Sequence, residues 1–152
     1  EAAEFAYKYL AERDVHCLLY QGKYNLFNRE PEEEGILRQA KENGTGFIAF
    51  SPLAQGLLTN RYLNGIPEDS RMARGGFLKK EQLTEEVLSK IKVLNKMAEE
   101  RGQTLAEMAL AWVLKDDLVT SVIIGASSVA QLEDNLKAIR NTSFTKEELI
   151  RL

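Results

Sequence analysis

The sequence contains only one cysteine and one histidine among its 152 residues, and this scarcity excludes several kinds of site. A single thiol forms neither a disulfide framework nor a thiolate metal site. Cys17 stands in the apolar run CLLY, which predicts a buried, reduced strand residue. His16 precedes that run, so we expect it at the strand end away from any ligand, as a bystander.

The sequence also has no apolar stretch of the ~20 residues that cross a membrane, and nothing that resembles a signal peptide. Its 20 basic and 23 acidic residues are interspersed, with a net charge of -3, so no broad basic face is available for nucleic acid or an acidic membrane. We therefore expect a cytoplasmic protein without nucleic-acid partners or membrane insertion, in which a local cluster holds any polyanionic ligand. The start lacks an initiator methionine and is already in a helical pattern, which leads us to expect missing upstream sequence.

What is present is the composition of a folded domain, with 44% hydrophobic residues and three short apolar runs between helical segments. Such runs predict parallel strands buried on both faces. The predicted strands are 17–20, 46–50 and 121–124; the predicted helices are 2–13, about 31–43, 83–101, one from Thr104, one from Ser128 and one from Thr145. In the first helix Ala2, Phe5, Ala6, Tyr9 and Leu10 share one face. This order fits either an open doubly wound sheet or a slice of a barrel.

Two segments that follow predicted strands carry the candidate chemistry, because both α/β architectures bind ligands at that end of the strands. After Phe50 the pattern is lost until about residue 82, and so long a loop suggests function. In the second segment, 125–128, Gly125 permits close backbone approach, while Ser127 and the following helix start suit a phosphate. The alternative is that Ser128 and Gln131 only form a capping box. A Rossmann site is excluded, because the one G-x-G, at 44–46, precedes a strand.

Several long motifs resemble the carboxy-terminal half of aldo-keto reductases, in the branch of L-glyceraldehyde 3-phosphate reductases and voltage-gated potassium channel β-subunits. They are QGKYNLFNRE (21–30), AFSPLAQGLLTNRYLNGIPEDSR (49–71), QTLAEMALAWVL (103–114) and SVIIGASSVAQLEDNL (121–136). The resemblance implies an α/β fold, the carboxy-terminal portion of a (β/α)8 TIM barrel with three parallel strands, helices and a long loop over the cofactor. Residues 1–152 would then be part of one barrel domain whose amino-terminal half is absent.

The same resemblance implies NADPH or NADP+ as cofactor. Gln21 is similar to the residue that hydrogen-bonds the nicotinamide carboxamide, with Tyr24 near the ring. The strand-to-loop segment along the nicotinamide and pyrophosphate corresponds to Phe50, Ser51, Pro52, Leu53 and Ala54. Arg71, helped by Arg61, matches the basic partner of the extra phosphate. The adenosine end corresponds to Gly125, Ser127, Gln131, Asp134 and Asn135, with Leu132 and Leu136 facing inward.

No catalytic residue is expected in this chain, because the family's Tyr, Lys, Asp and His belong to the amino-terminal strands. Tyr20, Tyr24 and Tyr62 have no nearby lysine partner in a pattern that would imitate the catalytic acid. Three hypotheses stay open: part of an NADPH-dependent reductase of small aldehydes and ketones, an NADP(H)-binding regulatory β-subunit of an ion channel, or an inactive half-barrel. Three strands cannot close a barrel, so the isolated chain should be unstable, or two copies should pair their edges as a homo-oligomer.

Overall fold

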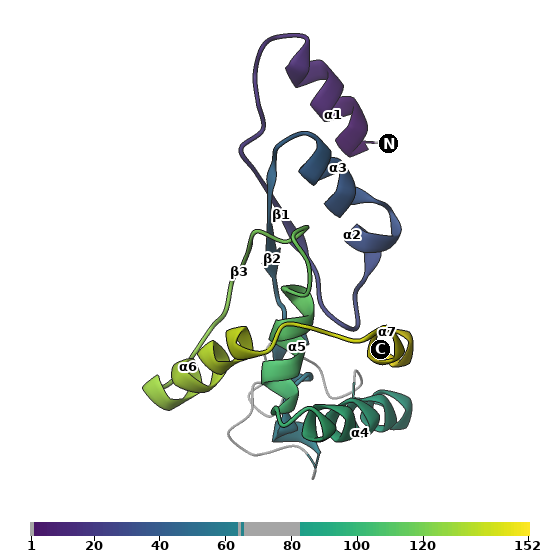
Figure 1. The fold of residues 1–152 in the computed structure, drawn as a ribbon, viewed down its shortest axis with the longest axis vertical. Helices are drawn as coiled ribbons and strands as arrows, with labels where there is room; N and C mark the ends of the chain where they lie inside the picture. The colour runs from purple at the N-terminus through teal and green to yellow at the C-terminus, as the bar shows by residue number, and fades with distance from the viewer. Residues whose placement is uncertain (1, 64, 66–82) are drawn as a thin grey trace.

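A computed structural model describes residues 2–63, 65 and 83–152, arranged around one small parallel sheet (Figure 1). The strand order is β1 (Leu19–Lys23), β2 (Gly46–Phe50), β3 (Ser121–Val122). In the register, Gln21 lies opposite Ile48, and Ile48 lies opposite Ser121. The predicted three parallel strands are therefore confirmed, and the bounds of β2 agree with the sequence-based prediction.

The helices also follow the predicted order, except that the one predicted over about 31–43 is divided into α2 and α3, and the 3-10 turns were not predicted. The elements are α1 (Ala2–Ala11), α2 (Glu30–Glu33), α3 (Ile36–Glu42), η1 (Ala54–Gly56), η2 (Asn60–Tyr62), α4 (Glu85–Glu100), α5 (Leu105–Val113), α6 (Val129–Leu136), η4 (Lys137–Arg140) and α7 (Lys146–Arg151). Threonines open the helices where the sequence predicted them, and the Thr104–Glu107 and Thr145–Glu148 capping boxes both form. These starts are local hydrogen-bond patterns, which is why the sequence predicts them well.

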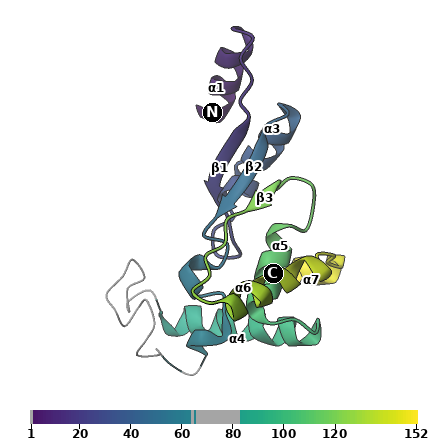
Figure 2. The ribbon, with the colours of Figure 1, turned by 90° about the vertical axis from the view of Figure 1, so that its left-hand side faces the viewer.

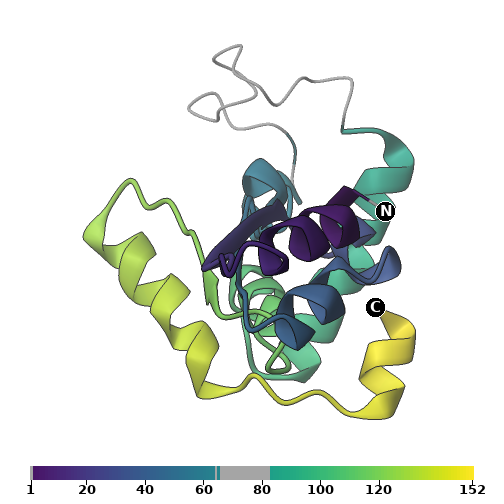
Figure 3. The same ribbon diagram turned by 90° about the horizontal axis from the view of Figure 1, so that it is seen from above.

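One face of the sheet is covered, and the hydrophobic core lies there. Phe47 and Ala49 of β2 are fully buried, together with Trp112 of α5 and Leu37 of α3. Gly22 of β1 leaves the room that this packing needs, because an added Cβ would lie 2.7 Å from the Phe47 ring. Helix α5 stands at the centre of the molecule, with α6 and α7 on either side of it (Figures 1 and 3).

The opposite face of the sheet is not covered by any described residue to the same extent. Leu19 of β1 is 49% exposed, Gln21 and Lys23 are exposed, and Ile48 and Phe50 of β2 are only partly buried. The expectation that every strand is buried on both faces is therefore wrong for this chain. Strands β1 and β3 are edges in the described part of the chain, so nothing packs beyond them.

The first strand also begins later than predicted, and this changes the surroundings of Cys17. Cys17 precedes β1, is only partly buried, and its Sγ lies 3.5 Å from the Leu19 carbonyl oxygen. The prediction of a buried strand cysteine is wrong, because the CLLY run turns its leucines toward solvent, with Leu18 79% exposed. His16 also precedes β1 and is exposed.

Helix α1 lies at the end of the molecule farthest from α4 (Figure 2). The apolar face that the sequence predicted is exposed, with Phe5 70% and Tyr9 47% accessible, while Tyr7 is the residue buried. The helix contacts α3 through that other side. The periodicity of the sequence identified the apolar face of this helix. It does not show whether another element covers that face, and no described element does.

Candidate cofactor site

The carboxyl ends of β1 and β2 are joined to each other by two hydrogen bonds beyond the strand ladder. The Tyr24 backbone N–H donates to the Phe50 carbonyl at 3.3 Å. The Asn25 side-chain Nδ2 donates to the Ser51 carbonyl at 2.9 Å. These contacts bring together the segments 21–25 and 50–54, which hold seven of the predicted cofactor residues.

Gln21 and Phe50 of this set lie on the uncovered face of the sheet. Gln21 is opposite Ile48 in the parallel register, and Lys23 is opposite Phe50. Paired residues of parallel strands share a face, so Gln21, Lys23, Ile48 and Phe50 all point away from the core that Phe47 and Ala49 fill. A polar carboxamide and an aromatic ring are thus both available to a ligand there.

The backbone immediately after β2 adopts a conformation that non-glycine residues rarely take. Ser51, Ala54 and Gln55 have φ angles of 53°, 46° and 59°. Left-handed residues of this kind cost about 1–2 kcal/mol each and cluster at functional sites. The segment that the resemblance assigns to the nicotinamide and pyrophosphate is therefore the most strained stretch among the described residues.

The side chains of Pro52, Leu53 and Ala54 turn toward the protein. Pro52 is buried, and Leu53 and Ala54 pack partly against the hydrophobic core. The predicted contact of these three residues with a cofactor can then use only the backbone or a small part of each side chain. Arg61 lies exposed on η2, where its backbone N–H donates to Thr59 Oγ1. Arg71 lies outside the described residues.

Tyr24 is enclosed in the core, which corrects its predicted place near a nicotinamide ring. It is 0% exposed, and its ring packs on Trp112 at 4.9 Å between centroids. Its hydroxyl donates to Glu32 Oε2 at 3.2 Å and accepts from Lys115 Nζ at 2.9 Å. The sequence placed it beside Gln21, but β1 ends at Lys23 and the ring turns inward to α5.

The structure brings a lysine to one of the tyrosines, since Lys115 donates to the Tyr24 hydroxyl. The two residues are 91 positions apart, so spacing gave no sign of the contact. Burial raises the pKa of Tyr24 above its usual range, with a further rise from the Glu32 carboxylate. The hydroxyl is enclosed and bonded to Glu32 and Lys115, so it is not placed to donate a proton to a substrate.

The second candidate segment joins β3 to α6, where hydrogen bonds close around Ser127. Both the backbone N–H and the hydroxyl of Ser127 donate to Gln131 Oε1, at 2.7 and 3.0 Å. Ser128 caps the helix by accepting from the Gln131 N–H at 3.2 Å. The cap predicted as the alternative is thus present, but the Gln131 side chain bonds Ser127 instead of completing the box. Two donors that converge on one oxygen are the arrangement that a phosphate oxygen needs.

Gly125 is exposed at the start of this segment, and nothing in the described chain requires glycine there. A Cβ added at this position would meet no heavy atom within 4 Å, and its φ lies outside the left-handed region. Steric freedom at a strand end with no internal cause agrees with the predicted approach of a ligand to the backbone.

The predicted orientation of α6 is wrong. Asn135 is buried and Leu132 and Leu136 are 41% and 52% exposed, the reverse of the expected arrangement. Helix α6 and the following η4 both contact α5, which buries Asn135 and Ala138. Asp134 is exposed but bonds Lys137 within the same helix region. Asn135 therefore points into the protein, and of the pair only Asp134 is accessible to a ligand.

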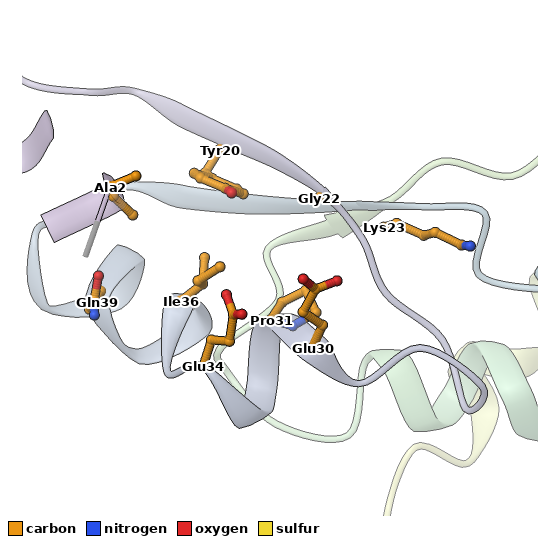
Figure 4. Close-up of a pocket in the computed structure, with 10 residues that line it drawn as sticks. Ala2, Tyr20, Gly22, Lys23, Glu30, Pro31, Glu34, Ile36 and Gln39 are labelled. Atoms are coloured by element: carbon orange, nitrogen blue, oxygen red, sulfur yellow. The ribbon is translucent and has the colours of Figure 1, made fainter.

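A separate groove of about 710 Å³ lies on the other side of β1, among α1, α2 and α3 (Figure 4). Its lining includes Tyr20, Glu30, Glu34 and Gln39, and none of the predicted cofactor residues. Two carboxylates in the wall disfavour a polyphosphate by like-charge repulsion. We therefore do not place the cofactor there.

No group of three or more His, Cys, Asp or Glu side chains in the described part of the chain is placed to hold a metal ion. No described helix combines the length and hydrophobicity that a membrane span requires.

Comparison with known proteins adds a family and a fold. The model of the aldo/keto reductase family matches residues 2–152. The L-glyceraldehyde 3-phosphate reductase of Escherichia coli (strain K12) is 51% identical over 147 residues, covering 94% of this chain and 42% of that protein. A probable voltage-gated potassium channel subunit beta of Arabidopsis thaliana is 39% identical over 128 residues, covering 82% of this chain and 39% of that subunit.

Among solved structures, the thermostable aldo-keto reductase Tm1743, crystallised with the inhibitor epalrestat, superposes with a TM-score of 0.64 at 24% identity. The match covers 94% of this chain and 41% of that one. At this identity it shows the fold alone, which is that of part of a (β/α)8 barrel. The chain thus spans about two fifths of the length of the relatives that it matches.

Proposed function

Because this chain belongs to the aldo/keto reductase family, we propose that it is the carboxy-terminal part of one barrel domain of a cytoplasmic, NADPH-dependent reductase of small aldehydes and ketones. In this proposal residues 1–152 supply most of the NADP(H) site, and the remaining strands of the domain supply the catalytic acid. The proposal concerns the whole protein, because the chain covers 42% of a reductase relative.

The observation that carries the proposal is the difference between the two faces of the sheet. Phe47 and Ala49 are sealed against helices, whereas Leu19, Gln21 and Phe50 line a face that the described residues leave open. In a closed barrel this second face becomes the interior, and strand ends such as those at Ser51 and Gly125 surround the ligand. An inward-facing carboxamide at Gln21 then has a cofactor amide as its partner.

In this proposal the chain binds the cofactor, and the rest of the domain supplies the proton that the reaction needs. NADPH supplies the hydride that is transferred to the carbonyl carbon of the substrate. Negative charge then develops on the carbonyl oxygen, and protonation of that oxygen contributes about 10²- to 10⁴-fold to the rate. Tyr24 is buried and engaged with Lys115 and Glu32, so it does not meet this need.

The test is cofactor binding and turnover by the complete protein. We expect tighter binding of NADPH than of NADH, and loss of that preference in Arg71→Ala, by about 1.5–3 kcal/mol or roughly ten- to a hundredfold. The role of Arg71 rests on the resemblance alone, because the residue lies outside the described part of the chain. Loss of NADPH absorbance with methylglyoxal or glyceraldehyde phosphate measures turnover. Equal affinity for the two cofactors would remove the NADPH assignment.

A regulatory NADP(H)-binding subunit is the second candidate, supported by the 39% identity to the probable channel subunit. That hypothesis predicts cofactor binding with no turnover of small aldehydes. An inactive half-barrel, alone or paired as a homo-oligomer, predicts neither property. Binding and turnover measured on the same sample therefore separate the three candidates.

A further inference from the structure

The turn after β2 is strained, because residues other than glycine adopt left-handed backbone conformations there. Three of the five residues from Ser51 to Gln55 are non-glycine residues with positive φ, namely Ser51, Ala54 and Gln55. Residues with a Cβ disfavour this region, so such a turn persists only where its surroundings hold it. The contacts that hold it are therefore part of the site.

One of those contacts comes from a fully buried side chain just beyond the end of the neighbouring strand, β1. Ser51's carbonyl accepts from the Ala54 N–H at 3.0 Å, within the turn, and from Asn25 Nδ2 at 2.9 Å, across the sheet. Asn25 is 0% exposed, and its Oδ1 accepts from the Phe27 N–H at 2.9 Å. Because its oxygen is engaged by that N–H, the amide nitrogen faces Ser51.

The Asn25 backbone is fixed as well. Its N–H donates to the Asn28 carbonyl at 3.1 Å, and its own carbonyl accepts from the Asn28 N–H at 3.0 Å. Because the Asn25 backbone is fixed, its side chain holds the end of β2 in place relative to the end of β1. It does so without exposing any atom to a ligand.

We propose that Asn25 is a positioning residue, which sets the left-handed backbone of Ser51 and thereby the place of Phe50 and Ser51 at the nicotinamide end of the site. This inference rests on the proposed function, since it assigns Asn25 a role in NADPH binding. Asn25 acts through Ser51 and does not itself touch the cofactor.

The chain offers a matched control at the other end of the same two strands. Thr45, also buried, donates its hydroxyl to the Cys17 carbonyl at 2.7 Å and so joins the segment before β2 to the segment before β1. Thr45→Val removes a buried side-chain hydrogen bond beside the same two strands, at the end opposite to Ser51. A residue that only stabilises the fold should behave like Thr45.

The experiment compares Asn25→Asp and Thr45→Val with the wild type in the complete protein. The introduced carboxyl still accepts from Phe27, but when ionised it has no proton to donate to Ser51. We expect Asn25→Asp to weaken NADPH binding about tenfold at about pH 8 and to approach wild type at about pH 6, as the buried carboxyl gains a proton. Thr45→Val should keep the wild-type affinity and pH profile while unfolding at a lower temperature. If Asn25→Asp loses stability but keeps the wild-type affinity and pH profile, the proposal is overturned.

A second measurement does not depend on cofactor binding. Hydrogen exchange of the amides in 51–58, without cofactor, should be faster in Asn25→Asp than in wild type and unchanged in Thr45→Val. Unchanged exchange in Asn25→Asp overturns the inference, whereas failure of the wild type to bind NADPH refutes the proposed function only.

A third variant covers the case in which Asn25→Asp does not fold. Glycine adopts positive φ without a steric penalty, so the double variant Asn25→Asp/Ser51→Gly should fold where Asn25→Asp alone does not. It should also recover part of the NADPH affinity, measured against Ser51→Gly alone. If the double variant does not fold although Ser51→Gly alone does, or binds NADPH about tenfold more weakly than Ser51→Gly alone, Asn25 does not act through the Ser51 backbone, and the proposal fails.

Discussion

The two faces of the sheet differ in how far the chain completes them by itself. On the covered face, Phe47 and Ala49 meet Trp112 and Leu37, and all four are at most 1% exposed. On the opposite face, Leu19 is 49% exposed and Ile123, beyond β3, is 48% exposed. The same strands thus have a finished core on one side and an unfinished surface on the other.

This difference separates stability from function within one small sheet. The covered face packs on apolar side chains around Phe47 and Ala49, and its groove at Tyr20 is lined by none of the predicted cofactor residues. The open face carries Gln21 and Phe50, and strained or uncrowded backbone at Ser51 and Gly125 stands at the strand ends. Substitutions on the covered face should lower stability, and those of Gln21, Phe50 and the strand ends should lower ligand affinity.

Trp112→Ala should give the largest effect, because it removes the largest fully buried side chain. We expect a loss of about 3–5 kcal/mol in the free energy of unfolding, from lost burial and a cavity against Tyr24. Val93→Ala on α4 is the control, since Val93 is 60% exposed, and it should change stability by less than about 0.5 kcal/mol. Urea denaturation measures both, and similar losses in the two variants would refute the assignment of the core.

Arg101→Ala should come next, because Arg101 ties the end of the chain to the covered side. Its side chain is 5% exposed, donates to Glu148 Oε1 at 2.6 Å and to the Ser143 carbonyl at 2.9 Å, and lies over the Phe144 ring. We expect a loss of about 3 kcal/mol. Arg151→Ala, which breaks a half-exposed pair with Glu100, should cost at most about 1 kcal/mol.

The Arg101 effect should also depend on pH in a direction that Glu148 sets. Hydrogen bonds from the Thr145 N–H and from Arg101 hold the pKa of Glu148 below its usual value of 4.5. A lowered carboxyl pKa stabilises the fold above the unfolded-state pKa, and this contribution is lost as the pH falls through the folded-state pKa. The stability difference between wild type and Arg101→Ala should therefore be full above about pH 5.5 and shrink under more acidic conditions. Denaturation curves at several pH values check this, and a difference that grew with acidity would contradict it.

Leu19→Ala tests whether the open face becomes an interior in the complete protein. If further strands cover β1, the substitution should cost about 2 kcal/mol; at a solvated face it should cost less than about 0.5 kcal/mol. We expect the larger value. The melting temperature of the complete protein, with and without the substitution, distinguishes the two, and a negligible change would argue against a closed barrel.

Gly125→Ala should give the smallest change in stability and a selective change in binding. No described atom lies within 4 Å of the added Cβ, so unfolding should be unaffected, while NADPH affinity should fall about tenfold if the backbone meets the cofactor. Gly35→Ala is the opposite control, because Gly35 has a φ of 73°, and it should lower stability by about 1 kcal/mol without changing affinity. Fluorescence titration with NADPH, beside thermal unfolding, tests the pair.

Features that depend on near neighbours in sequence were predicted well. The strand Gly46–Phe50 and both threonine capping boxes are where the sequence placed them. Helix α4 stops at Arg101 and Gly102, the latter in the left-handed conformation that ends helices. For the capping boxes and the end of α4 the hydrogen-bond partners lie within about four residues, so the local sequence contains the whole interaction. The strand was predicted from its short apolar run, although its partners lie 27 and 73 positions away.

Features that need a distant partner were predicted poorly. The Tyr24–Lys115 contact spans 91 positions, and the Asn25–Ser51 bond spans 26. Neither leaves a periodic signal, and Asn25 was noticed only as part of a family motif. Which faces of α1 and α6 are exposed could not be predicted for a related reason. Periodicity identifies an apolar stripe on a helix but not what lies against it.

The sequence alone therefore determined the order and type of the elements, the family, and which strand ends carry candidate ligand groups, since these depend on local pattern and on motif. Only the tertiary structure decided which face of each element is buried. It placed Tyr24 in the core and Asn135 against α5, left Gln21 exposed, and joined Asn25 to the strained turn at Ser51. Whether a face is buried depends on residues that are distant in sequence and pack against it. The periodicity of this chain therefore does not show which face of the sheet stays uncovered.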